Sequence, residues 1–157
     1  MNTVNKIEKQ VELKVESLGN IFGLLLNDKE SGNVRKYKLS IPDYQRAYEW
    51  KSYHVKNLLN DTYSGSIKDL KYLMGTIILH YNNSDGDIKY DIIDGQQRLI
   101  TLTILLYCLG VTNSPLINSN FSNANSFYYI QNTKNEINAF LKNKTNLQLL
   151  SKQWRKV

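Results

Sequence analysis

The stretch IKYDIIDGQQRLITLTILL, residues 88–106, changes its hydrophobic pattern at its centre. Residues 88–94 alternate apolar and polar side chains, which is typical of a strand with one buried face. Residues 96–109 are apolar beyond their first turn and long enough for a helix, so we expect a strand that leads directly into a helix. The connection between the two reads DGQQR. A tight turn requires only Asp-Gly, and the two glutamines and the arginine therefore need another explanation.

The start of this helix has the chemistry of a phosphate site. The first N–H groups of a helix have no partner within the helix and lie at the positive end of its dipole. Gly95 allows a ligand to approach this backbone closely, and Arg98 adds a permanent cation whose planar fork suits phosphate oxygens. Gln96 and Gln97 are suited to orient a phosphate oxygen, a ribose or an attacking water. The motif therefore predicts binding of a phosphorylated ligand.

Helix capping is the alternative explanation of the same residues. Asp94 and Gln97 have the spacing of a capping box, in which each side chain accepts a hydrogen bond from a backbone N–H of the same helix end. Arg98 would then be solvated or paired with Asp91. A carboxylate beside a phosphate repels it unless a divalent cation bridges the two. A phosphate site therefore requires Asp94 either to hold Mg²⁺ or to turn away and cap the helix.

A second unusual cluster, IPDYQRAYEW at residues 41–50, begins where a strand is expected to end at its proline. Aromatic side chains interleaved with a cation are typical of base stacking and phosphate contact. The alternative is a small aromatic core in which Tyr44, Tyr48 and Trp50 bury their rings and Arg46 stacks on one of them. We favour the core for Tyr48 and Trp50. The glutamine and the arginine of the cluster suit a core poorly, and we expect them to bind a ligand or to support its site.

The rest of the chain predicts an α+β domain with one small mixed sheet flanked by helices. Further strands are expected at 11–15, 36–42 and 72–81, with a hairpin turn at 82–87. Further helices are expected at 18–25, 53–63 and 131–150, the first two capped by Ser17 and Ser52. Polar loops are expected at 27–33 and 110–126.

Composition narrows the classes of function. The 157 residues carry a net charge of +6, which favours polyanionic partners such as nucleic acid or nucleotides. The single cysteine, Cys108, excludes an internal disulfide, and His54 and His80 lack the neighbours of a zinc site or an HNH nuclease centre. Apolar runs stay well short of the ~20 residues that span a bilayer, and the N-terminus lacks the apolar core of a signal peptide. We expect a cytoplasmic protein without membrane contact.

Four segments together resemble the N-terminal domain of GmrSD-type restriction endonucleases, which are modification-dependent, type IV restriction systems of bacterial phage defence. In chain order these segments are IPDYQRAYEW, LLNDTY, YLMGTIIL and YDIIDGQQRLITL. The resemblance runs from about Ile21 to Leu109. It implies a fold like those of ParB proteins and sulfiredoxin, with binding and hydrolysis of nucleoside triphosphates. Asp61, in LLNDTY, matches a recurrent acidic position to which we assign no role.

The resemblance also assigns residues to the nucleotide site. It places there the motif DGQQR and the neighbouring motif YQR, which comprise Asp94, Gly95, Gln96, Gln97, Arg98, Tyr44, Gln45 and Arg46. Arg98 is expected to bind phosphates, Arg46 to reach a terminal phosphate or DNA, and Gln97 to position water for catalysis. Asp94 is expected to hold Mg²⁺.

The expected organisation is a ParB-like nucleotide-binding domain at residues 1–110, followed at 111–157 by a polar loop and a helical segment that completes the fold or is truncated. Proteins of this kind usually carry DNA cleavage in a separate HNH-type domain. We therefore expect this chain not to cut DNA by itself and a nuclease domain or subunit to be supplied elsewhere. The rival hypothesis is a non-catalytic ParB-like module that binds DNA or a partner protein. A third is a small scaffolding protein in which DGQQR only caps a helix.

Overall fold

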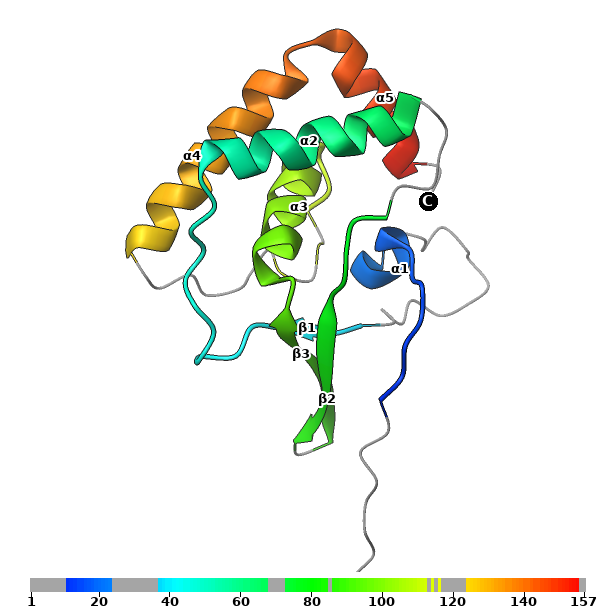
Figure 1. The fold of residues 1–157 in the computed structure, drawn as a ribbon, viewed down its shortest axis with the longest axis vertical. Coiled ribbons are helices and arrows are strands. Elements are labelled where there is room, and N and C mark those ends of the chain that lie inside the picture. Colours follow the sequence, from blue (N-terminus) through cyan, green and yellow to red (C-terminus); the bar gives the residue numbers. More distant parts are fainter. Residues whose placement is uncertain are drawn as a thin grey trace, which may run out of the picture.

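The computed structural model describes residues 11–23, 37–67, 73–84, 86–112, 114, 116 and 124–155. Its elements, in chain order, are α1 (Leu18–Phe22), β1 (Leu39–Ser40), α2 (Ser52–Ile67), β2 (Ile78–Ser84), β3 (Asp87–Asp94), α3 (Gln96–Cys108), α4 (Ala124–Leu141) and α5 (Lys144–Arg155) (Figure 1). They form an α+β domain, as predicted. Over these ranges, we find no helix with the length and hydrophobicity needed to cross a membrane.

The sheet is small and mixed, and β3 is its central strand, in the order β1–β3–β2. β3 pairs in parallel with β1, where Leu39 lies opposite Tyr90, and antiparallel with β2, where Tyr81 lies opposite the same residue. Figure 1 shows the β2–β3 hairpin extending away from the helices, while the other end of β3 runs straight into α3. The sheet therefore brings the end of β3 to the middle of the molecule.

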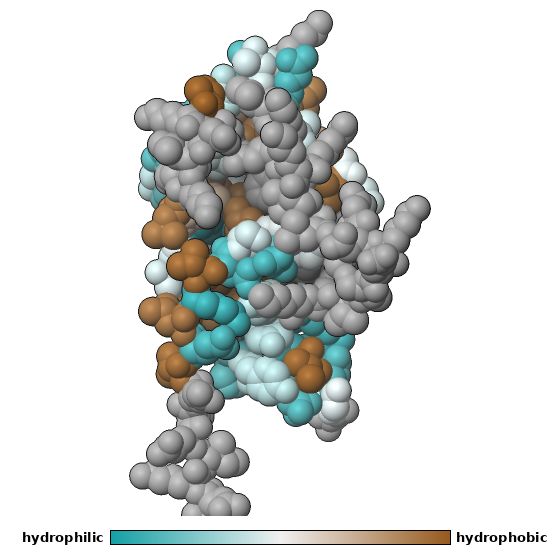
Figure 2. All heavy atoms as spheres, turned by 90° about the vertical axis from the view of Figure 1, so that its right-hand side faces the viewer, coloured by the Kyte–Doolittle hydropathy of each residue, from teal (hydrophilic) through white to brown (hydrophobic). Residues whose placement is uncertain are grey.

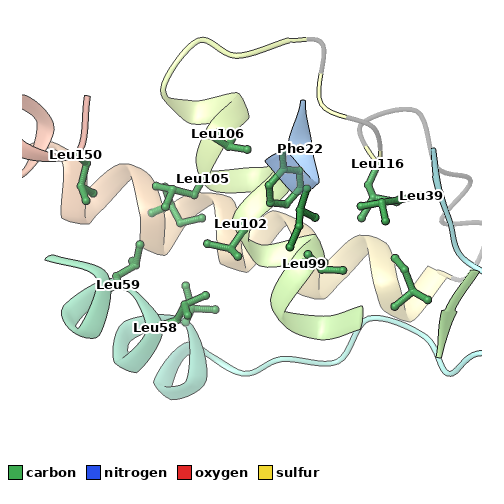
Figure 3. Close-up of a cluster of buried hydrophobic side chains, with 14 of the residues drawn as sticks. Phe22, Leu39, Leu58, Leu59, Leu99, Leu102, Leu105, Leu106, Leu116 and Leu150 are labelled. Carbon is green, nitrogen blue, oxygen red and sulfur yellow. The ribbon is translucent and has the colours of Figure 1, made fainter. Parts of the chain in front are cut away.

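The hydrophobic core surrounds α3, which is buried along most of its length. Figure 3 shows leucines of α3 packed among side chains of other elements, and its labelled residues are Phe22, Leu39, Leu58, Leu59, Leu99, Leu102, Leu105, Leu106, Leu116 and Leu150. Ile137 and Leu141 of α4 belong to the same cluster. The helices that follow residue 110 thus contribute to the core that anchors α3.

The predicted strand at 11–15 is wrong, because no described strand pairs with this segment. Val11, Leu13 and Val15 are 92%, 92% and 91% exposed. The segment lies on the face shown in Figure 2, where apolar groups project along one edge. Alternating apolar residues can give a strand one apolar face, but a strand also needs a neighbouring backbone with which to form hydrogen bonds. The pattern therefore fails here for lack of a pairing strand.

The helix after this segment begins as predicted and ends early. The Oγ of Ser17 accepts a hydrogen bond from the Asn20 N–H at 3.1 Å, which confirms Ser17 as its cap. α1 ends at Phe22, and its C-cap residue Gly23 adopts φ 65° and donates its N–H to the Asn20 carbonyl at 3.3 Å. Residues 24–25 of the expected helix and the expected turn at 27–33 lie outside the described residues.

The strands agree best with prediction where they pair with each other. The strand predicted at 88–94 is confirmed and gains one residue at its start. The strand predicted at 36–42 is reduced to the two residues of β1, with position 36 outside the described residues. Within the described part of the strand predicted at 72–81, which begins at residue 73, β2 starts only at Ile78, because Gly75 adopts φ 98°, a conformation that interrupts a strand. β2 in turn extends into the predicted turn at 82–87.

Two helices of the first half of the chain need only small corrections. α2 is longer than the predicted 53–63, and Ser52 is its first helical residue instead of its cap. At this end the Lys51 N–H donates to His54 Nδ1 at 3.2 Å. In a capping box, the side chain of a glutamate accepts the corresponding hydrogen bond. The helix predicted at 96–109 is confirmed and ends at Cys108.

The helix predicted at 131–150 is two helices, because the chain breaks between α4 and α5. Asn143 lies at this break, and its Oδ1 accepts a hydrogen bond from the Thr145 N–H at 3.0 Å, which starts α5. α4 begins at Ala124, inside the predicted loop at 110–126. Much of that loop lies outside the described residues.

Candidate functional site

Gly95 makes the direct step from β3 into α3 possible. It adopts φ 86° and ψ 5°, and a residue with a Cβ pays about 1–2 kcal/mol for such a left-handed conformation. A Cβ here would also lie 3.0 Å from Ile77 Cγ1. Glycine is therefore required both by the conformation and by the packing. We refer to Asp94, Gly95, Gln96, Gln97 and Arg98 as the strand–helix turn.

The capping-box interpretation of the strand–helix turn is wrong. Gly95, and not Asp94, is the N-cap residue of α3, and it makes no side-chain capping hydrogen bond. Asp94 is exposed, and its Oδ1 accepts a hydrogen bond from the Gly95 N–H at 2.8 Å. The left-handed glycine displaces Asp94 by one residue from the position that a capping box requires. Gln97 points toward another segment instead of back to the helix end.

The two glutamines bind the backbone of the segment Pro42–Trp50, which we call the YQR loop. Gln96 Nε2 donates to the Arg46 carbonyl at 2.9 Å, and Gln97 Nε2 donates to the Ala47 carbonyl at 2.9 Å. Gln97 Oε1 accepts from the Glu49 N–H at 2.9 Å. Both side chains are buried, with 7% and 6% of their surface exposed. The two side-chain amides therefore satisfy backbone groups of this loop that in a sheet would bond to a neighbouring strand.

Two further contacts fix the YQR loop. Gln45 Nε2 donates to the Ile93 carbonyl at 3.1 Å, which ties the loop to the end of β3. The Tyr48 N–H donates to Ser126 Oγ at 3.0 Å, which ties it to the start of α4. The loop thus has fixed points before and after Arg46, whose own side chain is exposed.

The predicted aromatic core is confirmed for Tyr48 and is wrong for Tyr44. Tyr48 is 1% exposed, and its hydroxyl lies 2.8 Å from Thr101 Oγ1 and 2.9 Å from Thr133 Oγ1. Burial raises the pKa of the Tyr48 hydroxyl above its ordinary value of 10.0. Trp50 is half-buried and stacks on His54. Tyr44 is 74% exposed, because its side chain projects from the loop into solvent.

Tyr48→Phe should lower the free energy of unfolding by about 1–2 kcal/mol, because two hydroxyl hydrogen bonds are lost while the ring keeps its packing. Urea denaturation measures the change. The control is Tyr44→Phe, which alters an exposed hydroxyl and should stay within about 0.5 kcal/mol of the wild type. Equal values for the two variants would contradict the assigned role of the Tyr48 hydroxyl.

Arg98 lies against the segment Leu73–Ile77, which precedes β2. Its Nη1 donates to the Thr76 carbonyl at 3.1 Å. A Cβ built on Gly75 would lie 3.1 Å from Nη1 and 3.2 Å from Cζ and Nη2, so the guanidinium rests on the glycine backbone. The side chain is half-buried. Because a guanidinium has five N–H donors, this contact leaves donors for a ligand.

The predicted alternative in which Arg98 pairs with Asp91 is wrong. Asp91 Oδ1 accepts a hydrogen bond from Ser40 Oγ at 2.8 Å, and its Oδ2 accepts one from Asn82 Nδ2 at 2.8 Å. The carboxylate thus links all three strands of the sheet. The hydrogen bonds from Asn82 and Ser40 lower the pKa of Asp91 below its ordinary value of 3.8.

The stability of the sheet should depend on the ionisation of Asp91. Because the folded pKa is lower than the unfolded one, the carboxylate contributes stability above pH 3.8, and this contribution is lost as the pH falls through the folded pKa. Asp91→Asn should flatten this part of the curve of unfolding free energy against pH. Chemical denaturation between pH 2 and pH 6 checks this prediction. An unchanged curve in the variant would contradict it.

Asp94 is the only residue of the strand–helix turn with a carboxylate. Within the ranges described, no group of three or more His, Cys, Asp and Glu side chains could hold a metal ion. A protein usually contributes one or two carboxylates to Mg²⁺, and waters and substrate phosphates supply the other ligands. Asp61 lies on the exposed side of α2, outside the strand–helix turn.

Sequence reasoning did not find Gly75 and Thr76. The signal was an isolated glycine in the apolar run YLMGTIIL, which marks a close approach of backbone to another group. The glutamines were found, but their hydrogen bonds to the YQR loop were not. These bonds join residues that are 48 or 50 positions apart in the sequence, so the local pattern does not indicate them.

The sequence model of one family, described as GmrSD restriction endonuclease, N-terminal domain, matches residues 22–157. The chain belongs to this family. The GmrSD N-terminal domain is a component of restriction endonucleases, and the match here extends beyond Leu109 through α4 and α5. Neither a search of curated proteins nor a search of solved structures gave a match.

Proposed function

We propose that this GmrSD N-terminal domain binds a nucleoside triphosphate at the strand–helix turn and the YQR loop, as part of a modification-dependent DNA restriction system. One observation carries the proposal. The amides of Gln96 and Gln97 bind the backbone at Arg46, Ala47 and Glu49, so the two motifs form one unit. A mere helix cap would not require this connection.

Arg98 is suited to bind a phosphate in this unit. It is half-buried, and in the part of the chain that is described its guanidinium bonds to a neutral carbonyl and forms no ion pair with a carboxylate. Its full positive charge is therefore available to an anion. The first N–H groups of α3 lie in the same turn and favour negative charge.

Arg46 is suited to a second contact with the phosphates or with DNA. Its side chain is exposed, but its backbone is held by Gln96 through the bond at 2.9 Å. A cation on a fixed backbone loses less conformational entropy when it binds than one on a free loop. Gln97 has both ends of its amide bound to the YQR loop, which supports a positioning role. The expected role in orienting water stays a prediction.

The residues present also fit the expected Mg²⁺ and nucleotide. Asp94 is exposed, and one of its oxygens is engaged by the Gly95 N–H, which leaves the other for the ion. When bound, Mg²⁺ would share the negative charge of the phosphates. Gln96 Oε1 is buried and has no hydrogen-bond partner among the described residues. An acceptor of this kind costs about 1–3 kcal/mol, which supports a further donor, from ligand or water, at the contact between turn and loop.

Calorimetric titration of the wild-type domain with Mg²⁺ and each of ATP, GTP, CTP and UTP tests the proposal. We expect one-site binding of at least one of them, together with a rise in melting temperature. The matched control is the corresponding nucleoside, which has no phosphate and should not bind measurably. Absence of binding by all four triphosphates would contradict the proposal.

The second candidate is a non-catalytic module that binds DNA, with the nuclease activity supplied by another domain or subunit. The exposed Tyr44, two residues before the exposed Arg46, favours it, because an aromatic ring and a cation together suit a base and its phosphate. The net charge of +6 points the same way. Binding by phosphate contacts should weaken steeply with salt. Fluorescence anisotropy with DNA at 50 and 200 mM salt measures the slope.

A further inference from the structure

We infer that Gly75 is a positioning residue for Arg98 and that Leu73–Ile77 forms one wall of the proposed phosphate site. The inference rests on the proposed function for its effect on ligand binding, but not for the geometry of Arg98 itself. Neither the DGQQR motif nor the YQR motif includes this segment.

The guanidinium of Arg98 lies so close to Gly75 that even a methyl group would crowd it. Three guanidinium atoms lie 3.1–3.2 Å from the position of a Cβ on Gly75. These contacts are tighter than almost all contacts of real Cβ atoms, so an added methyl group would push the guanidinium away by a few tenths of an ångström. Such a shift would distort the hydrogen bond from Nη1 to the Thr76 carbonyl, which fixes the direction of the side chain.

The same segment touches the strand–helix turn at a second point. A Cβ on Gly95 would lie 3.0 Å from Ile77 Cγ1 and 3.4 Å from the Thr76 carbonyl oxygen. The backbone of residues 75–77 therefore packs on both Gly95 and Arg98. Gly95 and Arg98 therefore both lie against the same short segment.

The choice of a carbonyl as the anchor has an electrostatic consequence. A carboxylate would fix Arg98 equally well but would neutralise its charge and repel an incoming phosphate. The Thr76 carbonyl orients the guanidinium and leaves its net charge unchanged. The wall formed by residues 73–77 thus holds the Arg98 guanidinium in one orientation, with its positive charge available to an anionic ligand.

Gly75→Ala tests the inference, with Gly110→Ala as its matched control. Gly75 and Gly110 have φ of 98° and 90°, so alanine introduces similar backbone strain at both. A Cβ on Gly75 would meet Arg98, whereas a Cβ on Gly110 would meet nothing within 4 Å. We therefore expect a similar fall in melting temperature for both variants but weaker ligand binding only for Gly75→Ala.

Binding is measured by calorimetry with Mg²⁺ and inorganic tripolyphosphate, a probe that has phosphates and no base. Gly75→Ala should weaken it about tenfold, the effect of removing one hydrogen bond to a charged group. In the Arg98→Ala background, Gly75→Ala should add nothing. If Arg98→Ala binds like the wild type, both the proposed function and the inference are wrong. If Arg98→Ala loses binding and Gly75→Ala matches Gly110→Ala, only the inference is wrong.

The Arg98 side chain can also be followed without any ligand. Its Nε–H signal in a ¹⁵N NMR spectrum is assigned by its loss in Arg98→Ala. This signal should shift in Gly75→Ala and stay in place in Gly110→Ala. An unshifted signal in Gly75→Ala would overturn the inference independently of any nucleotide chemistry.

Discussion

If the domain hydrolyses the nucleoside triphosphate that we propose it binds, Arg98→Ala should reduce the release of phosphate by about 10³-fold, because an arginine that meets the charge of a phosphoryl transition state contributes about this much to the rate. The structure gives the physical reason for a large effect. Arg98 is half-buried and oriented by the Thr76 carbonyl, so its charge is held in place beside the start of α3. Phosphate release from the four common nucleotides with Mg²⁺ measures the change.

Two controls make this result specific. Lys89→Ala removes one positive charge from the hairpin, at a side chain that is paired with Asp87, and should leave the rate unchanged. Circular dichroism should show that Arg98→Ala keeps its fold, since its loss removes one hydrogen bond at the surface of the domain. Equal rates for the wild type and Arg98→Ala would show that the strand–helix turn has no part in hydrolysis.

Gln97→Ala should lower the free energy of unfolding by about 1–3 kcal/mol, since two partly buried hydrogen bonds of a buried amide are lost. The substitution leaves the Ala47 carbonyl and the Glu49 N–H without their partner. It also releases the YQR loop from the start of α3. We therefore expect nucleotide binding to weaken as well, even though Gln97 need not touch the ligand. Urea denaturation and calorimetry measure the two effects.

Gln45→Ala is the matched control for Gln97→Ala. Gln45 also holds the YQR loop with a side-chain amide, but it makes a single hydrogen bond of 3.1 Å at an exposed site. Its loss should change the free energy of unfolding by less than about 1 kcal/mol. A smaller effect for Gln97→Ala than for Gln45→Ala would contradict the importance of the buried amide.

The sequence predicted the path of the chain around DGQQR well, for a physical reason. β3 is the central strand, and α3 is buried along most of its length, so their hydrophobic patterns are strong and their boundaries are sharp. The segment at 11–15 has a comparable alternation of apolar residues. It failed because a strand exists only where another backbone pairs with it, and that information is absent from local sequence.

The candidate site, too, could be predicted only in part. The residue types in the strand–helix turn were enough to select it as a candidate site. What each side chain contacts was not predictable, because the partners come from elsewhere in the chain: the glutamines bind the YQR loop, and Arg98 rests on Gly75. The capping box was excluded only by the left-handed backbone of Gly95, which the sequence permits but does not impose.

The most direct test of the central claim is a crystal structure of the domain with Mg²⁺ and a non-hydrolysable analogue of the triphosphate that binds best. The account predicts that phosphate oxygens lie within hydrogen-bonding distance of the Arg98 guanidinium and of the first N–H groups of α3. Phosphates bound elsewhere on the domain, with Arg98 free of contact, would contradict it.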